Sequence, residues 1–164
     1  MRFFNTEGPV RADIHYYLPP LTRWNLNEII ELIHQQKYFL LHAPRQTGKT
    51  SCLLALMEYL NNDGRYRALY ANIESAQAAR ENLIPAITGI IQTIANSARL
   101  ILNDSHPTTL VREVLADQSI TIALQEFLTR WSQSSPQPLV LLLDEVDALI
   151  GDTLISLLRQ LRAG

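Results

Sequence analysis

A ten-residue stretch in the first third of the chain carries groups suited to binding an anion. It reads His42-Ala43-Pro44-Arg45-Gln46-Thr47-Gly48-Lys49-Thr50-Ser51 and ends in Gly-Lys-Thr, as does the phosphate-binding pattern G-x-x-x-x-G-K-[ST]. In such a loop, backbone N–H groups at a helix N-terminus point at the anion, and the helix dipole favours negative charge there. The sequence therefore predicts a phosphate-binding loop. The predicted nucleotide-binding residues are Ala43, Pro44, Arg45, Gln46, Thr47, Gly48, Lys49, Thr50 and Ser51.

Three residues of this loop have distinct predicted roles. Gly48 lets the backbone pass close to a phosphate because it has no Cβ, Lys49 reaches the β and γ phosphates, and the Thr50 hydroxyl suits Mg²⁺. Ala43 stands where the pattern has its first glycine. Alanine is the next smallest residue and is tolerated there if its φ is negative. We therefore expect Gly48 to be the least replaceable residue of the loop.

Two carboxylates follow the most hydrophobic run of the chain. Residues 139–143 are all aliphatic, and Asp144 and Glu145 come directly after them. A buried strand gains nothing in packing from two charges at its end, although a solvated strand end before a turn is an alternative. Because neighbouring strand residues point to opposite faces, the two carboxylates suit separate roles. We expect Asp144 to hold Mg²⁺ through water and Glu145 to polarise the attacking water, with Lys49 and Glu145 catalytic.

The loop must be placed by the elements on either side of it. Residues 37–42, "KYFLLH", form an aromatic and aliphatic run that predicts a strand buried on both faces. After Lys49, apolar residues three and four apart predict a helix that ends at Gly64 as its C-cap. The expected order of strand, loop and helix favours a nucleotide-binding loop over a chance match.

The rest of the chain alternates between helical and strand patterns. Asn25 as N-cap and Glu28 as its capping-box partner predict a helix start, and Pro85 divides the helical pattern over 75–102 into two. The face Ile84, Ile87, Ile91 and Ile94 should be buried in that pattern. Strands are expected over 65–73 and 139–143, one or two helices over 109–131, and a last helix over 152–161. This alternation predicts an α/β fold.

Composition limits the function classes. The 164 residues suit one domain, and 47% hydrophobic with 18% charged residues is typical of a globular protein. A formal charge of −2 gives no electrostatic support for a nucleic-acid partner. No run of about 18 apolar residues suggests a membrane span. Cys52 is the single cysteine, which favours a reducing compartment, so we expect a cytoplasmic protein without a membrane partner.

Both motifs together resemble those of P-loop ATPases of the additional-strand class, which includes the AAA-type ATPases. "APRQTGKT" is similar to their Walker A motif, and "LVLLLDEVDAL" is similar to Walker B. "PRQTGKTS" and the upstream "HYYLPPLTRW" resemble bacterial and archaeal AAA-like ATPases related to signal-transducing STAND NTPases. The resemblance runs from Tyr16 to the last residue. It implies a three-layer α/β/α fold with a mainly parallel sheet, and ATP and Mg²⁺ as cofactors.

The resemblance also has implications for both ends of the chain. It implies that residues 1–24 pack near the nucleotide, with Tyr17, Pro20 and Arg23 as candidates to line the adenine, although packing over the sheet edge is an equal alternative. In these families a further strand lies between the Walker A and Walker B strands, and its counterpart would follow residue 164. We therefore expect one P-loop domain over 1–164 whose last strands and lid are missing. Direct pairing of 37–42 with 139–143 is the alternative.

Three functions fit these residues. The first is Mg²⁺-dependent ATP binding and hydrolysis coupled to conformational change. The second is a nucleotide-gated regulatory or interaction module with little hydrolysis, and the third is a P-loop kinase, which the adjacent carboxylates disfavour. Besides the nucleotide, a second copy of the chain or a regulatory protein is the expected partner.

Overall fold

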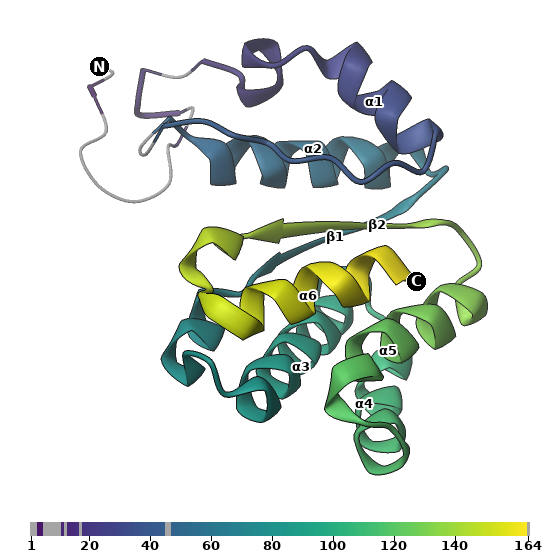
Figure 1. Cartoon of the computed structure of the whole chain (residues 1–164). Helices are drawn as coiled ribbons and strands as arrows, with labels where there is room; N and C mark the ends of the chain where they lie inside the picture. The colour runs from purple at the N-terminus through teal and green to yellow at the C-terminus, as the bar shows by residue number, and fades with distance from the viewer. Residues whose placement is uncertain (1–2, 5–10, 12, 17, 45–46, 164) are drawn as a thin grey trace. The chain divides into compact units, whose positions relative to one another are not determined.

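The computed structural model describes residues 3–4, 11, 13–16, 18–44 and 47–163 (Figure 1). The chain divides into two compact units, residues 1–59 and residues 60–164, and each is described by itself. The boundary falls within one helix, α2 (Lys49–Asp63). The predicted phosphate-binding loop lies in the first unit, and the two predicted carboxylates lie in the second.

The first unit contains a short 3₁₀ helix, η1 (Pro20–Arg23), followed by α1 (Leu26–His34). Helix α1 begins where the sequence predicts, and Ile29 and Ile33 of its apolar face are buried. The predicted capping box is wrong, because the Asn25 side chain makes no bond to the helix backbone. Its amide nitrogen donates to Glu28 Oε2 at 3.1 Å instead. The carboxylate thus engages the side chain that was expected to cap the helix.

Residues 37–42 were predicted to form a buried strand, and this prediction is wrong. In the described part of the chain the only named strands are β1 (Arg67–Asn72) and β2 (Leu139–Asp144), and they pair with each other. The Tyr38 and Leu40 side chains are 66% and 83% exposed. A strand needs a neighbour to satisfy its backbone groups, so an apolar run without one does not become a strand.

Helix α2 ends as predicted at a glycine. Gly64 has a φ of +79°, and its N–H donates to the Leu60 carbonyl at 3.3 Å, as in a left-handed C-cap. The Asn61 side chain then joins the last turn of α2 to β1: its Nδ2 donates to the Ala68 carbonyl at 3.0 Å, and its Oδ1 accepts from the Ala68 N–H at 2.8 Å. The Asn61 amide therefore fixes the short connection between the two elements.

The two strands of the second unit are parallel. The register runs from Arg67 opposite Leu139 to Asn72 opposite Asp144, so both strands end at the same edge of the sheet. The remaining elements are η2 (Glu74–Ala79), α3 (Leu83–Ile101), α4 (His106–Asp117), α5 (Ile120–Ser134), η3 (Val146–Ala148) and α6 (Gly151–Ala163). The mixture of helices with a small parallel sheet agrees with the predicted α/β class.

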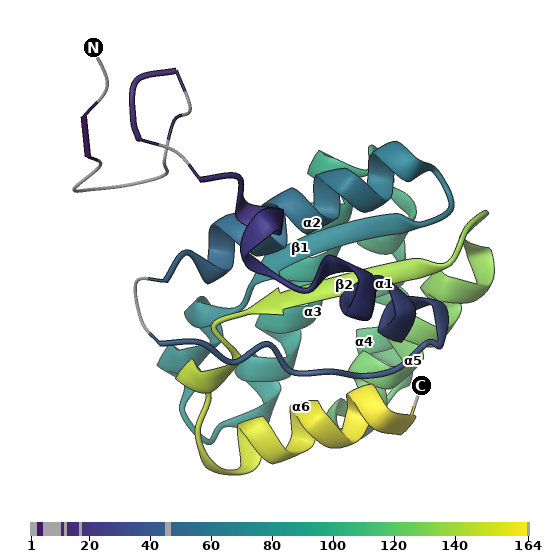
Figure 2. The same ribbon diagram turned by 90° about the horizontal axis from the view of Figure 1, so that it is seen from above.

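Four helices, α3 to α6, lie on one side of the sheet (Figures 1 and 2). Helix α3 contacts β1, α4, α5 and α6 and is the centre of the core. Pro85 lies in its first turn, which confirms the predicted division of the helical pattern after η2. Ile87, Ile91 and Ile94 are buried as predicted, whereas Ile84 is 65% exposed because it lies in the first turn of the helix.

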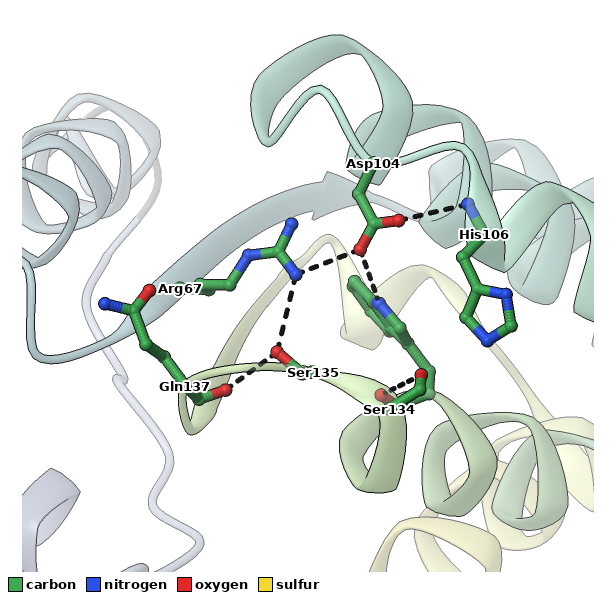
Figure 3. Close-up of polar contacts among 7 residues, drawn as sticks. Arg67, Asp104, His106, Ser134, Ser135 and Gln137 are labelled. Atoms are coloured by element: carbon green, nitrogen blue, oxygen red, sulfur yellow. Dashed lines mark hydrogen bonds and ion pairs between the residues drawn. The ribbon is translucent and has the colours of Figure 1, made fainter.

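A polar cluster holds the amino end of β1 against the helices (Figure 3). The Arg67 guanidinium lies 3.0 Å from Asp104 Oδ2, which also accepts a hydrogen bond from the Trp131 indole at 3.1 Å. Asp104 Oδ1 accepts from the His106 N–H at 3.0 Å. Burial raises the pKa of Asp104, but the hydrogen bonds of Trp131 and His106 and the Arg67 charge outweigh it, so the pKa is lowered. The cluster therefore anchors the end of the sheet opposite to Asp144.

Candidate functional site

The described residues of the predicted loop lead directly into a helix. The Thr47 hydroxyl donates to the Pro44 carbonyl at 2.7 Å. The Cys52 N–H donates to the Gly48 carbonyl at 3.0 Å, so α2 starts directly after Gly48. Arg45 and Gln46 lie outside the described residues, and their predicted contacts stay predictions.

The backbone conformation of Gly48 favours glycine. Its φ is +79°, a conformation that is strained for residues with a Cβ. A Cβ built there would lie 2.9 Å from Nη1 of Arg23, the end of a flexible side chain that can shift to make room. The expectation that Gly48 is the least replaceable residue thus has a physical basis in backbone conformation.

Lys49, Thr50 and Ser51 form the first turn of α2. Lys49 and Ser51 are partly buried, and Thr50 is exposed. The first N–H groups of a helix have no carbonyl partner within it, and they carry the positive end of the helix dipole. A left-handed glycine followed at once by such a turn, with a lysine and a hydroxyl in it, fits a phosphate chain and its Mg²⁺.

The N-terminal turn η1 contacts this junction of loop and helix. The Arg23 guanidinium donates through Nη2 to the Thr47 carbonyl. The Cys52 thiol donates to the Pro20 carbonyl at 3.4 Å. Burial raises the pKa of the Cys52 thiol, and the neighbouring Arg23 charge lowers it in part. Pro20 and Arg23, predicted as adenine contacts, thus lie against the loop and the helix start, whereas Tyr17 lies outside the described residues.

Asp144 is the last residue of β2 and is only 6% exposed. Its Oδ1 accepts from the Glu145 N–H at 3.0 Å, and its Oδ2 accepts from the Tyr70 hydroxyl at 3.0 Å. A buried carboxylate held from two sides is a hard oxygen ligand of the kind that Mg²⁺ takes, directly or through water.

Glu145 has a left-handed backbone, with φ 60° and ψ 32°, which is uncommon outside glycine. The Ala148 N–H donates to its carbonyl at 3.1 Å, and the 3₁₀ turn η3 follows. The chain therefore turns sharply at the end of β2. The side chain of Glu145 is half-buried. The predicted position of both carboxylates at a strand end is confirmed, and their roles stay predictions.

Tyr70 is the site residue that sequence reasoning missed. It lies inside the predicted strand 65–73, and its hydroxyl reaches a carboxylate 74 residues further along the chain. The parallel register places Tyr70 two residues before the Asn72–Asp144 pair, so Tyr70 and Asn72 point to the same face. No sequence pattern carries that information, because it depends on which strand becomes the neighbour.

A comparison with protein families matches residues 26–163 to the AAA ATPase domain. The chain belongs to this family. Searches of curated proteins and of solved structures gave no match. Membership in the AAA ATPase family indicates nucleotide binding, with ATP as the nucleotide. The AAA match covers both the loop and the two carboxylates, and it begins after Arg23. None of the helices formed by the described residues has the length and apolar character needed to cross a membrane.

Proposed function

We propose that this AAA ATPase domain binds ATP with Mg²⁺ and hydrolyses the β–γ phosphoanhydride bond. The observation that carries the proposal is the left-handed Gly48 directly before Lys49 and Thr50 at the start of α2. Such a junction offers backbone donors, a cation and a hydroxyl to one phosphate chain. The family match over both motifs supports ATP over other anions.

Each residue of the proposed site has a separate role in hydrolysis. Bound Mg²⁺ would supply positive charge to the β and γ phosphates, with the Thr50 hydroxyl and Asp144 as the protein groups that hold it. Lys49 would stabilise the negative charge that develops on the phosphate oxygens. The remaining residues of the loop, Ala43 to Ser51, would orient the phosphates through their backbone.

Glu145 would act as the group that orients the attacking water and accepts its proton. The adjacent Asp144 carboxylate accepts hydrogen bonds from the Tyr70 hydroxyl and the Glu145 N–H, and we assign it to Mg²⁺. Glu145 is the other acidic group directly at this strand end, so we assign it to the water. The half-buried position of Glu145 suits a base that must meet a water molecule. We expect hydrolysis to be coupled to a change in conformation.

Two matched pairs of variants test the proposal. Glu145→Gln should keep ATP binding and lose turnover, whereas Glu113→Gln, at an exposed position of α4, should turn over normally. Lys49→Ala should lose ATP binding, whereas Lys37→Ala should not. Because Lys37 and Lys49 are the only lysines, amine labelling followed by mass spectrometry gives a second readout. ATP should protect Lys49 and leave Lys37 reactive. Normal hydrolysis by Glu145→Gln would refute the role of Glu145.

The same measurements separate the nucleotide-gated module from the ATPase. A module without turnover would bind ATP through Lys49 and change its oligomeric state with the nucleotide, with the same negligible turnover in wild type and Glu145→Gln. Transfer of phosphate to a metabolite would favour a kinase. We further propose one P-loop domain over residues 1–164, located in the cytoplasm, with a second copy or a regulatory protein as partner.

A further inference from the structure

The N-terminal turn η1 lies outside the AAA ATPase match, yet it bonds once to the predicted phosphate-binding loop and once to the first turn of α2. The turn is closed by its own residues: the Thr22 hydroxyl donates to the Pro19 carbonyl at 2.7 Å, and the Thr22 N–H donates to the same oxygen at 3.2 Å. From this closed turn, Arg23 and the Pro20 carbonyl reach the loop and the first turn of α2.

One nitrogen of the Arg23 guanidinium donates a hydrogen bond to the backbone of the loop. Nη2 donates to the Thr47 carbonyl, and Nη1 lies 2.9 Å from the point where a Cβ on Gly48 would stand. The lack of a side chain on Gly48 is therefore what lets the guanidinium approach the loop this closely. Among the described residues, Nη1 has no hydrogen-bond acceptor and Arg23 has no carboxylate partner.

The Arg23 guanidinium lies beside Gly48, at the start of the helix that the proposed function assigns to phosphate binding. A guanidinium has five donors in a planar fork that matches phosphate oxygens, and the bond to Thr47 occupies only one of them. The charge of Arg23 also acts on the thiol of Cys52, in the first turn of α2, whose pKa it lowers in part. An anion held by the N–H groups of the same turn would meet the same charge.

We infer that Arg23 is a ligand of the nucleotide's phosphates, a second cation beside Lys49, supplied by η1 from outside the family match. This inference rests on the proposed function. It differs from the adenine contact that resemblance alone implies for Arg23, because Arg23 contacts the carbonyl directly before Gly48. The ligand class is a polyphosphate, and its recognition does not depend on the base.

Three chemically different probes test the inference by calorimetry on the whole chain: ATP, AMP and inorganic tripolyphosphate. Arg23→Gln should lower the affinities for ATP and for tripolyphosphate by a similar factor, about tenfold to a hundredfold for one lost charge-assisted contact. The affinity for AMP should fall less. Arg11→Gln is the matched control, since it removes the same charge from an exposed arginine of the N-terminal segment, which pairs with Asp13. If Arg23 instead contacts the adenine, Arg23→Gln would lower the affinities for AMP and ATP alike and leave the affinity for tripolyphosphate unchanged. That result would overturn the inference.

Arg23→Lys separates a phosphate ligand from a residue that only positions the loop. Glutamine keeps an amide donor on a shorter side chain and has no charge, whereas lysine keeps both the charge and a donor on a longer side chain. A phosphate ligand predicts that lysine retains most of the tripolyphosphate affinity and glutamine does not. Equal loss in both variants, or retention by glutamine, would overturn the inference even if Arg23→Gln also lowers the melting temperature. If the wild-type chain fails to bind ATP, the proposed function itself fails, whereas normal ATP binding by both wild type and Arg23→Gln refutes the inference alone.

Discussion

The Tyr70 hydroxyl donates a hydrogen bond of 3.0 Å to Asp144 Oδ2 from the neighbouring parallel strand. Asp144 is 6% exposed, so this donor and the Glu145 N–H replace part of the water that a carboxylate would otherwise bind. Tyr70 therefore fixes the orientation of the carboxylate predicted to hold Mg²⁺. Partners of this kind tune metal affinity without touching the metal.

Tyr70→Phe should lower the affinity for Mg²⁺ in the ATP complex by about tenfold, because the Asp144 carboxylate loses the donor that orients it. The free energy of unfolding should fall by about 1.5–3 kcal/mol, the usual range for a hydrogen bond to a charged group. Titrating Mg²⁺ against the fluorescence of a labelled ATP measures the first effect, and urea denaturation measures the second. Tyr59→Phe, at an exposed position of α2, is the control. An unchanged Mg²⁺ titration in Tyr70→Phe would contradict the positioning role.

Asp104→Asn should destabilise the chain at neutral pH. It leaves the Arg67 guanidinium, only 16% exposed, without its carboxylate. We expect a loss of about 2–3 kcal/mol. Urea denaturation of the variant and of Asp117→Asn, an exposed control at the end of α4, measures the difference.

The pH dependence of this loss has a definite sign. The pKa of Asp104 is lowered in the folded chain by the Trp131 and His106 hydrogen bonds and by Arg67, which together exceed the effect of burial. A lowered folded pKa means that the stabilisation is fully present above the unfolded value of about 3.9 and is lost as the pH falls through the folded pKa. The stability difference between wild type and Asp104→Asn should therefore begin to shrink below about pH 4 and level off only below the folded pKa of Asp104. A gap that stays constant from neutral to acid pH would argue against an ionised Asp104.

The order of elements could be predicted from the sequence because it depends mostly on local patterns. Helix α2 ends at Gly64, Pro85 lies in the first turn of α3, and the aliphatic run before Asp144 is a strand. The prediction for residues 37–42 failed because a strand also needs a neighbour, which a local pattern cannot provide. The α/β class followed from alternation, whereas the pairing of β1 with β2 did not.

Those parts of the candidate site that lie within one short segment could be predicted from the sequence. The loop from Ala43 to Ser51 and the Asp144–Glu145 pair could be found by residue type and spacing. The Tyr70–Asp144 bond could not, because it depends on strand register, and the left-handed backbone of Glu145 could not, because no glycine marks it. The approach of Arg23 to Thr47 depends on the path of the chain between two residues that are 24 positions apart.

Cys52 should report on the opening of the first unit. Its side chain is 1% exposed, and burial raises its pKa, with a partial opposing effect of Arg23. Maleimide labelling should therefore be slow in the native chain, roughly a hundredfold slower than in denaturant if opening costs about 3 kcal/mol. The rate should rise with pH later than for an ordinary thiol of pKa about 8.5. Mass spectrometry at timed intervals measures it, and native labelling as fast as in denaturant would contradict the burial.

Gly48→Ala and Gly89→Ala should have opposite effects on stability. Gly48 has a φ of +79°, and a Cβ there would meet Arg23 Nη1 at 2.9 Å, so alanine should cost about 1–2 kcal/mol and abolish ATP binding. Gly89 lies within α3 with nothing within 4 Å of an added Cβ. Alanine there should stabilise the chain by about 0.5–1 kcal/mol, because glycine is a poor helix former. Thermal denaturation and ATP titration of both variants test this contrast. If Gly48→Ala binds ATP as tightly as wild type, the loop does not need its left-handed glycine, and the phosphate-binding role assigned to this loop is wrong.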